Sequence, residues 1–208
     1  MIHLICYGAA VALNLAWLLL GDRLTLWTQV SVPVITVLVA GIGVALRLWE
    51  LPRGDARRRY LRGALWVFLV YYLAILSVLL FFGGLFHMDR GWGGNVNLEP
   101  FHTIRNYIRY YRNTGSHVSI FNLLGNIVIM APMGVLLPAL FRPLRRFWLT
   151  IPLLAVIPVA VECLQWRTAT GAADVDDAIL NFIGGVLGYL FVRTCQMIHA
   201  RWEKKRAQ

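Results

Sequence analysis

The sequence has few charged residues and few cysteines, and each shortage excludes a class of protein. Only 14% of the 208 residues are charged, whereas 59% are apolar. A soluble chain of this length could not bury so much apolar surface and would expose large apolar patches. The three cysteines are odd in number and scattered, which argues against a disulfide framework. The composition therefore predicts a membrane protein, because lipid can cover the apolar faces.

Motifs for the commoner chemistries are also missing. The sequence contains no phosphate-binding loop, no nucleophile elbow and no histidine-rich metal motif. A metal site would have to combine Glu162 and Asp174 with a histidine such as His102, and no fixed ligand spacing supports that combination. We therefore expect no metal site and no cofactor.

Six apolar stretches are long enough, or nearly so, to cross a bilayer as helices, which predicts an all-α polytopic membrane protein. We place these spans at residues 3–21, 28–48, 64–86, 118–141, 147–166 and 177–195. The net charge of +10 comes from short basic tracts between the spans, a pattern that argues against nucleic-acid binding. Three of these basic tracts are separated by two spans each and so lie on one side of the membrane. Together they hold 14 of the 20 Lys and Arg residues. They are Arg47, Arg53, Arg57, Arg58, Arg59 and Arg62; Arg142, Arg145 and Arg146; and Arg193, Arg201, Lys204, Lys205 and Arg206. Since basic loops stay in the cytoplasm, we expect a plasma-membrane protein with both termini cytoplasmic.

The long segment after the third span, residues 87–117, is expected on the outer side. Several glycines stand at its start, and Pro100 is suited to open a short helix. Apolar residues such as Ile104 and Ile108 then fall on one face, with arginines such as Arg105 elsewhere. This spacing favours a helix that lies on the outer membrane surface over a disordered loop.

Polar residues occur in the spans at positions where lipid would disfavour them. Helical spacings of three and four place them in groups, and with the predicted topology all the groups lie within roughly 10 Å of the outer boundary. We infer a shared polar pocket that opens outward, with these candidate residues: Asn122, Asn126, Glu162, Gln165, Asp174, Asp177, Asn181, His102 and Arg105.

Structural alternatives exist for some of these polar residues. Asn122 and Asn126 could simply join helices through hydrogen bonds. Asp174 and Asp176 could be solvated, and Asp177 could favour the start of the last span through the helix dipole. Glu162 is the strongest functional candidate, since an ionisable group about one turn inside a span is costly and usually functional.

Three stretches carry a family resemblance: NLEPF (97–101), FNLLGNIVIMAPMGVLLP (121–138) and VECLQWRTATGAADVDDAILNFIGGVLGYL (161–190). They resemble the VanZ-like membrane protein family, whose name comes from a protein associated with teicoplanin resistance. The resemblance implies a four-helix core at 64–195, preceded by two helices and a basic loop at 1–63 and followed by a basic tail at 196–208. The family often carries an arginine shortly before the Asp-rich turn, where this chain has Thr-Gly-Ala-Ala at 170–173.

Three functions fit the predicted pocket and the resemblance. The first is a binding protein that recognises membrane lipids, a lipid-linked cell-wall precursor or a lipoglycopeptide, and so modulates susceptibility to teicoplanin-type glycopeptides. The second is an intramembrane enzyme that modifies an envelope lipid, with Glu162 as acid or base and Asp174 or Asp177 holding a cation. The third is a small transporter or flippase, against which the absence of polar residues in the inner half of the spans argues.

Overall fold

The computed structural model describes residues 1–20, 26–82, 96–168 and 170–206, and nearly all of them are helical. Six of these helices are long and apolar enough to cross a membrane, so the chain is a multi-pass α-helical membrane protein, as its composition predicts. The described residues contain no strand, only an isolated backbone bridge between Asn97 and Asp174. The chain divides into two compact units, Met1–Ile75 and Leu76–Gln208.

The first unit contains α1 (Ile2–Leu20), α2 (Leu26–Glu50) and most of α3 (Asp55–Ser77). A polar triad joins the three helices. The side-chain amide of Asn14 donates to Thr36 Oγ1 at 2.9 Å, and the Tyr71 hydroxyl donates to Asn14 Oδ1 at 2.9 Å. Because hydrocarbon offers no competing hydrogen-bond partner, the triad favours a single register of the three helices.

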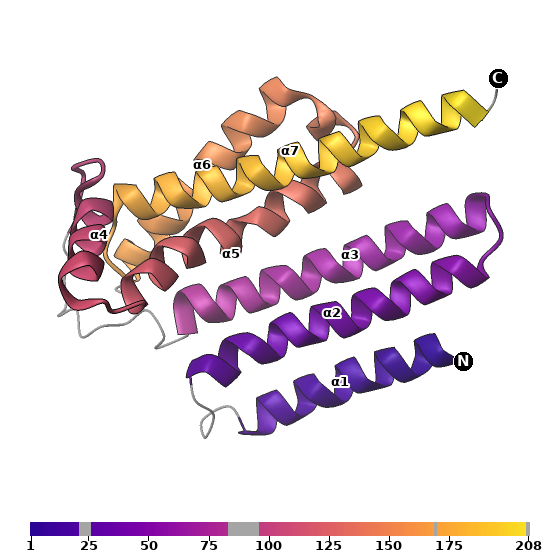
Figure 1. Cartoon of the computed structure of the whole chain (residues 1–208), viewed down its shortest axis with the longest axis horizontal. Helices are drawn as coiled ribbons and strands as arrows, with labels where there is room; N and C mark the ends of the chain where they lie inside the picture. The colour runs from indigo at the N-terminus through magenta and orange to yellow at the C-terminus, as the bar shows by residue number, and fades with distance from the viewer. Residues whose placement is uncertain (21–25, 83–95, 169, 207–208) are drawn as a thin grey trace. The chain divides into compact units, whose positions relative to one another are not determined.

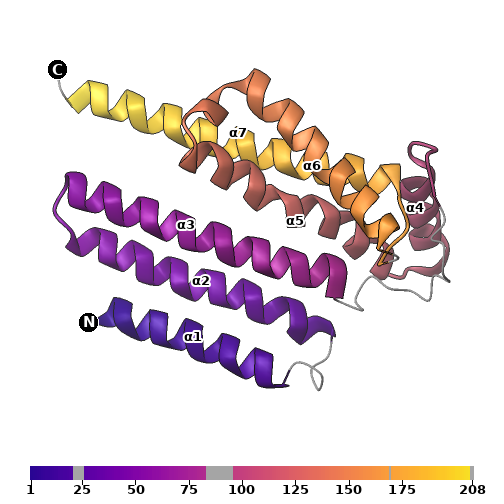
Figure 2. The ribbon, with the colours of Figure 1, turned by 180° about the vertical axis from the view of Figure 1, so that it is seen from behind.

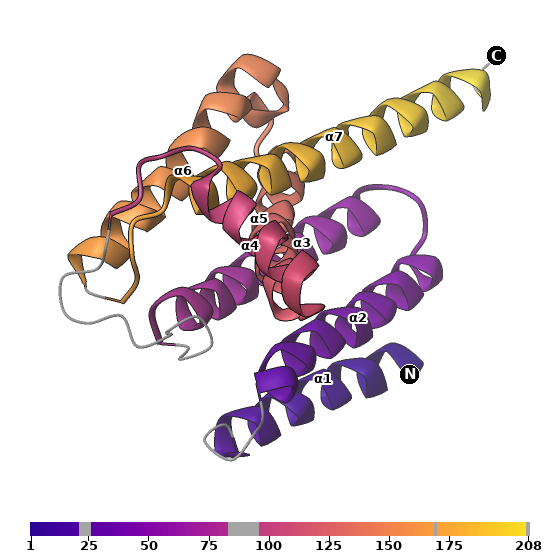
Figure 3. The ribbon, with the colours of Figure 1, turned by 60° about the vertical axis from the view of Figure 1, so that its left-hand side comes forward.

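The second unit contains a short π-helical turn and four longer helices: η2 (Val78–Phe82), α4 (His102–Thr114), α5 (Val118–Leu140), α6 (Phe147–Arg167) and α7 (Val175–Arg206). Helices α5 and α7 lie side by side, and α6 packs against α7 (Figures 1 and 2). Helix α4 lies across the end at which α5 and α7 begin, which Figure 3 brings forward. We call this the α4 end of the unit.

Glycines bring α5 and α7 into backbone contact. A Cβ atom added at Gly184 would lie 1.9 Å from the carbonyl oxygen of Ile127, and one added at Gly188 would lie 2.1 Å from that of Ala131. Gly134 of α5 is equally close to the backbone of α7. Small residues allow membrane helices to approach this closely. The contact sets the register in which the polar residues at the start of α5 and α7 meet.

Hydrogen bonds close the opposite end of the second unit, where the 3₁₀ turn η3 (Pro143–Arg145) links α5 to α6. The fully buried Thr150 hydroxyl donates to the carbonyl of Leu144, and the Tyr189 hydroxyl donates to that of Arg145 at 3.0 Å. The arginines of this link therefore lie at the far end of α5 from α4.

The six predicted spans are confirmed, but two helices extend beyond them. Helix α3 begins at Asp55, so much of the basic segment before the third span is helical, and α7 continues through the basic tail. Arginine and lysine are good helix formers and can extend their charged ends toward water, so a span can continue into a basic tract. The helix expected after Pro100 is α4. The glycines before it, and the predicted end of the third span at 83–86, lie outside the described residues.

Candidate functional site

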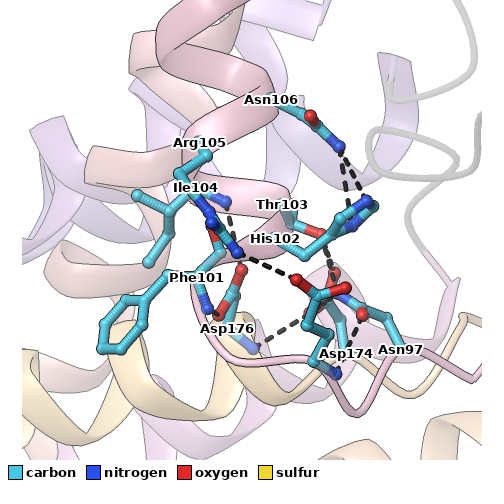
Figure 4. Close-up of polar contacts among 10 residues, drawn as sticks. Asn97, Phe101, His102, Thr103, Ile104, Arg105, Asn106, Asp174 and Asp176 are labelled. Atoms are coloured by element: carbon cyan, nitrogen blue, oxygen red, sulfur yellow. Dashed lines mark hydrogen bonds and ion pairs between the residues drawn. The ribbon is translucent and has the colours of Figure 1, made fainter.

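Asp174 joins the start of α7 to the segment before α4. It is the N-cap of α7, since its Oδ1 accepts a hydrogen bond from the backbone N–H of Asp176 at 2.9 Å. The same carboxylate accepts bonds from the Asn97 amide at 3.0 Å and the Thr103 hydroxyl at 2.6 Å (Figure 4). The Asn97 backbone N–H also donates to the carbonyl of Ala173 at 2.8 Å. Asp174 is 8% exposed, so these protein donors replace water.

Asp176 caps α4 from a different helix. Its side chain is fully buried, and its two oxygens accept the backbone N–H groups of Phe101 and Ile104 (Figure 4). The first N–H groups of a helix have no partner inside it and carry partial positive charge, so a carboxylate is stabilised there. Phe101 has a φ of 65°, a left-handed conformation that costs a non-glycine residue about 1–2 kcal/mol. The bonds to Asp176 offset this cost and hold α4 in place.

Glu162 and Gln165 connect α6 to its neighbours. Glu162 is 8% exposed, and its Oε2 accepts the backbone N–H of Asp174 at 3.1 Å. Gln165, nearly one turn further along α6, donates from Nε2 to the carbonyl of Leu80 in η2 at 3.1 Å. Glu162 therefore supports the turn that carries Asp174, and Gln165 fixes the π-helical turn.

Asn126 and Asp177 join α5 to α7. The Asn126 side-chain amide donates to Asp177 Oδ1 at 2.6 Å, which makes Asn126 an interhelical link. Asn181 lies one turn further along α7 and is only 4% exposed. Its side-chain oxygen has no hydrogen-bond donor among the described residues. A buried acceptor without a donor costs about 1–3 kcal/mol, so a donor supplied by a ligand would be stabilised at this position.

Three of the predicted site residues make no hydrogen bond to these carboxylates. Asn122 is half-buried on α5 and has no hydrogen bond within the described part of the chain. His102 is exposed and faces the Asn106 amide at 3.3 Å. Arg105 is also exposed, and its guanidinium pairs with Glu99 at 2.9 Å.

Three central residues of the network were not among the predicted site residues: Asn97, Thr103 and Asp176. Asn97 and Asp176 stand in the stretches that carry the family resemblance, so a signal for them existed. Thr103 had no such signal, because only the docking of α4 brings its hydroxyl to Asp174. The interpretation of Asp174 and Asp176 as solvated is wrong, since both side chains are buried.

The bonds described above make a buried carboxylate cluster of Glu162, Asp174 and Asp176 beneath α4. Backbone N–H groups, an amide and a hydroxyl stabilise the cluster, and no Lys or Arg of the described residues pairs with Asp174 or Asp176. No three His, Cys, Asp or Glu side chains in the described ranges are grouped so that they could hold a metal ion. Above the cluster, Leu98 and Phe101 are 74% and 55% exposed. The arrangement thus presents apolar side chains on a surface that buried carboxylates hold rigid.

Two comparisons with known proteins bear on this arrangement. The chain is 29% identical to Protein VanZ of Enterococcus faecium over 94 residues, which cover 45% of this chain and 50% of that protein. The chain therefore matches about half the length of this relative. No solved structure matches the chain.

A family model covers most of the second unit. The VanZ/LLP1 model covers residues 68–196, well over half of the chain. This range contains the carboxylate cluster, the segment that docks α4 and the glycine contact between α5 and α7. The chain therefore belongs to the VanZ/LLP1 family.

Proposed function

We propose that this protein binds an amphiphilic or lipid-linked component of the cell envelope at its α4 end, and that this binding modulates susceptibility to glycopeptides of the teicoplanin type. Membership of the VanZ/LLP1 family and the partial match to Protein VanZ support the link to glycopeptides. The observation that carries the proposal is the fixed position of α4. Buried carboxylates hold this helix across the ends of membrane-spanning helices, with apolar side chains exposed.

The proposal places the α4 end on the outer face of the plasma membrane. The arginines of the link between α5 and α6 lie at the other end of the second unit, as does the basic end of α7. Basic segments favour the cytoplasmic side, which puts both termini in the cytoplasm and α4 outside. In that orientation α4 faces the compartment in which glycopeptides meet lipid-linked precursors.

Two features suit an amphiphile in particular. Exposed Leu98 and Phe101 offer apolar contact area next to the headgroup level of the membrane. The buried oxygen of Asn181, which has no donor among the described residues, adds an acceptor for a hydroxyl or amide of a bound molecule that reaches in between the helices. Together they match a ligand that has both an apolar and a hydrogen-bonding part.

Substitutions at Glu162 separate binding from catalysis. In the structure its carboxylate accepts the N–H of Asp174, a role that a glutamine oxygen can also fill. If the protein binds its ligand without proton transfer, Glu162→Gln should keep the glycopeptide tolerance of the parent, whereas Glu162→Ala should lose it. If the protein is instead an enzyme with Glu162 as acid or base, Glu162→Gln should be nearly as damaging as Glu162→Ala.

The assay is teicoplanin susceptibility of cells that express each variant at matched membrane levels. Asp55→Ala serves as a control, because Asp55 is an exposed carboxylate at the start of α3, in the other unit. Parental tolerance in both Glu162 variants would contradict a functional role for this residue. If cells that express the parent protein are as susceptible to teicoplanin as cells that lack it, the proposed function itself is wrong.

A further inference from the structure

Beyond the carboxylate cluster, α4 carries a second feature on its exposed side. A hollow of about 410 Å³ opens along the helix, lined by Arg105, Ile108, Arg109, Arg112 and Asn113. Their spacing of three and four residues places them on one helix face. The volume falls within the range of small-molecule sites, roughly 300–1,000 Å³. The hollow is therefore large enough for a lipid headgroup.

The arginines that line this hollow carry positive charge, which the described residues neutralise only in part. Helix α4 contains three arginines and no acidic residue. Arg105 is paired with Glu99 and also donates to the Phe101 carbonyl, beside the first turn of α4 (Figure 4). Within the described residues, Arg109 and Arg112 have neither a hydrogen-bond acceptor nor an acidic partner. Nothing in the described part of the chain therefore occupies these two guanidinium groups, which can bind an anion.

The anion that this geometry fits best is a phosphate. Guanidinium groups bind phosphate through two parallel N–H···O bonds, and two arginines three positions apart on one helix can reach the same phosphate. Asn113 at the edge of the hollow adds an amide that can bond to a neighbouring hydroxyl.

The apolar surroundings indicate that the phosphate belongs to a lipid. Ile108 lines the hollow and is 36% exposed, and Tyr111 beside it is 36% exposed. Helix α4 lies across the ends of helices that are long enough to span a membrane, as Figures 1 and 3 show. A helix in that place lies at the level of the phosphates, where its arginines meet lipid headgroups and Ile108 beside them can contact the adjoining part of the lipid. A free phosphate ion would gain nothing from these apolar neighbours.

We propose that Arg109 and Arg112, with Ile108 and Asn113, form a site on α4 for the phosphodiester headgroup of an anionic phospholipid such as phosphatidylglycerol. The site is separate from the carboxylate cluster, which holds the opposite, inward side of α4 through Thr103. The lipid site does not depend on what binds near the carboxylate cluster, nor on which side of the membrane α4 lies. It therefore stands whether or not the proposed function holds.

The test is photo-crosslinking of the purified full-length protein in vesicles of phosphatidylcholine that contain a photoactivatable phosphatidylglycerol. Crosslinked peptides are identified by mass spectrometry. In the parent protein we expect labelling on residues 101–117. The double variant Arg109→Gln/Arg112→Gln should reduce this labelling at least tenfold, and Arg112→Gln alone should reduce it several-fold. The control Arg53→Gln/Arg58→Gln removes the same charge from exposed residues of the first unit and should leave the labelling unchanged.

Competition identifies the ligand class. Unlabelled phosphatidylglycerol should displace the probe from residues 101–117, whereas phosphatidylcholine and millimolar inorganic phosphate should not. Equal displacement by inorganic phosphate would overturn the assignment to a lipid. Labelling that survives in the double variant, with α4 still helical by hydrogen exchange, would overturn the site. If the double variant does not fold, Arg109→Lys/Arg112→Lys takes its place. This variant keeps the positive charge but loses the pair of parallel hydrogen bonds that a guanidinium makes to phosphate. Undiminished labelling in the lysine variant would also overturn the site.

Discussion

Replacement of Gly184 by alanine should push α5 and α7 apart. The added Cβ would lie 1.9 Å from the carbonyl oxygen of Ile127 and 2.7 Å from its carbonyl carbon, whereas an ordinary contact begins near 3.4 Å. Both atoms belong to helical backbone and cannot rotate away. The helices would have to separate by about 1.5 Å at this level, since a close-packed interior has no spare space.

The cost of this separation can be bounded from the structure. Overpacking of a tight interface typically costs about 1–3 kcal/mol. Separation would also stretch the 2.6 Å bond from Asn126 to Asp177, and interhelical bonds in membranes contribute about 0.6 kcal/mol each. The higher helix propensity of alanine offsets up to about 1 kcal/mol of this loss in stability. A net loss of about 2 kcal/mol follows, or a fall in Tm of roughly 4–8 °C for a chain of this size.

Thermal unfolding of the purified protein in detergent measures this loss directly. Gly125→Ala is the matched control, because Gly125 lies in α5, the helix that Gly184 of α7 contacts, but an added Cβ there has no neighbour within 4 Å. We expect Gly125→Ala to leave the Tm unchanged or raise it slightly. Equal Tm values for Gly184→Ala and Gly125→Ala would refute the argument that backbone contact at these glycines holds α5 to α7.

Three further predictions test other parts of the molecule. Asp176→Ala should speed hydrogen exchange of the Phe101 and Ile104 amides by about 10- to 100-fold. Each amide loses a hydrogen bond to a charged acceptor, which is worth roughly 1.5–3 kcal/mol. Unchanged exchange would mean that this carboxylate does not hold α4. Asn14→Leu should lower the stability of the first unit by about 1–2 kcal/mol, because the interhelical bonds of its triad are lost, and an unaltered Tm in detergent would show the triad to be dispensable. A reporter fused after Gly115 should signal the outside of the cell and one fused to the C-terminus the cytoplasm, and the reverse pattern would invert the proposed orientation.

The membrane-spanning helices could be predicted from the sequence alone, because the lipid bilayer imposes a simple rule. Every span must be a long apolar helix, so length and hydropathy locate it without knowledge of packing. The ends were harder to place, because arginines that look like a loop in the sequence continue the helix at the start of α3. Amphipathic spacing was enough to predict α4, although not what holds it in place.

The site was predicted in part, since polar residues in a span stand out but their partners do not. Glu162 and Asp177 were identified as exceptions to the apolar rule, and both make polar contacts in the structure. What the sequence could not indicate is that Asp176 caps a helix more than seventy residues earlier in the chain. Capping of this kind depends on tertiary contact, whereas the local capping rules look only within a few residues of a helix start.

We propose that the carboxylate-held α4 is required for the proposed effect of this protein on glycopeptide susceptibility. The most direct test is the teicoplanin susceptibility of cells that express Asp176→Ala at the membrane level of the parent, beside the control Asp55→Ala. Asp176→Ala should be as susceptible as cells without the protein, because α4 loses its cap, while Asp55→Ala should keep the parental tolerance. Full parental tolerance in Asp176→Ala, with α4 amides in rapid exchange, would contradict the account.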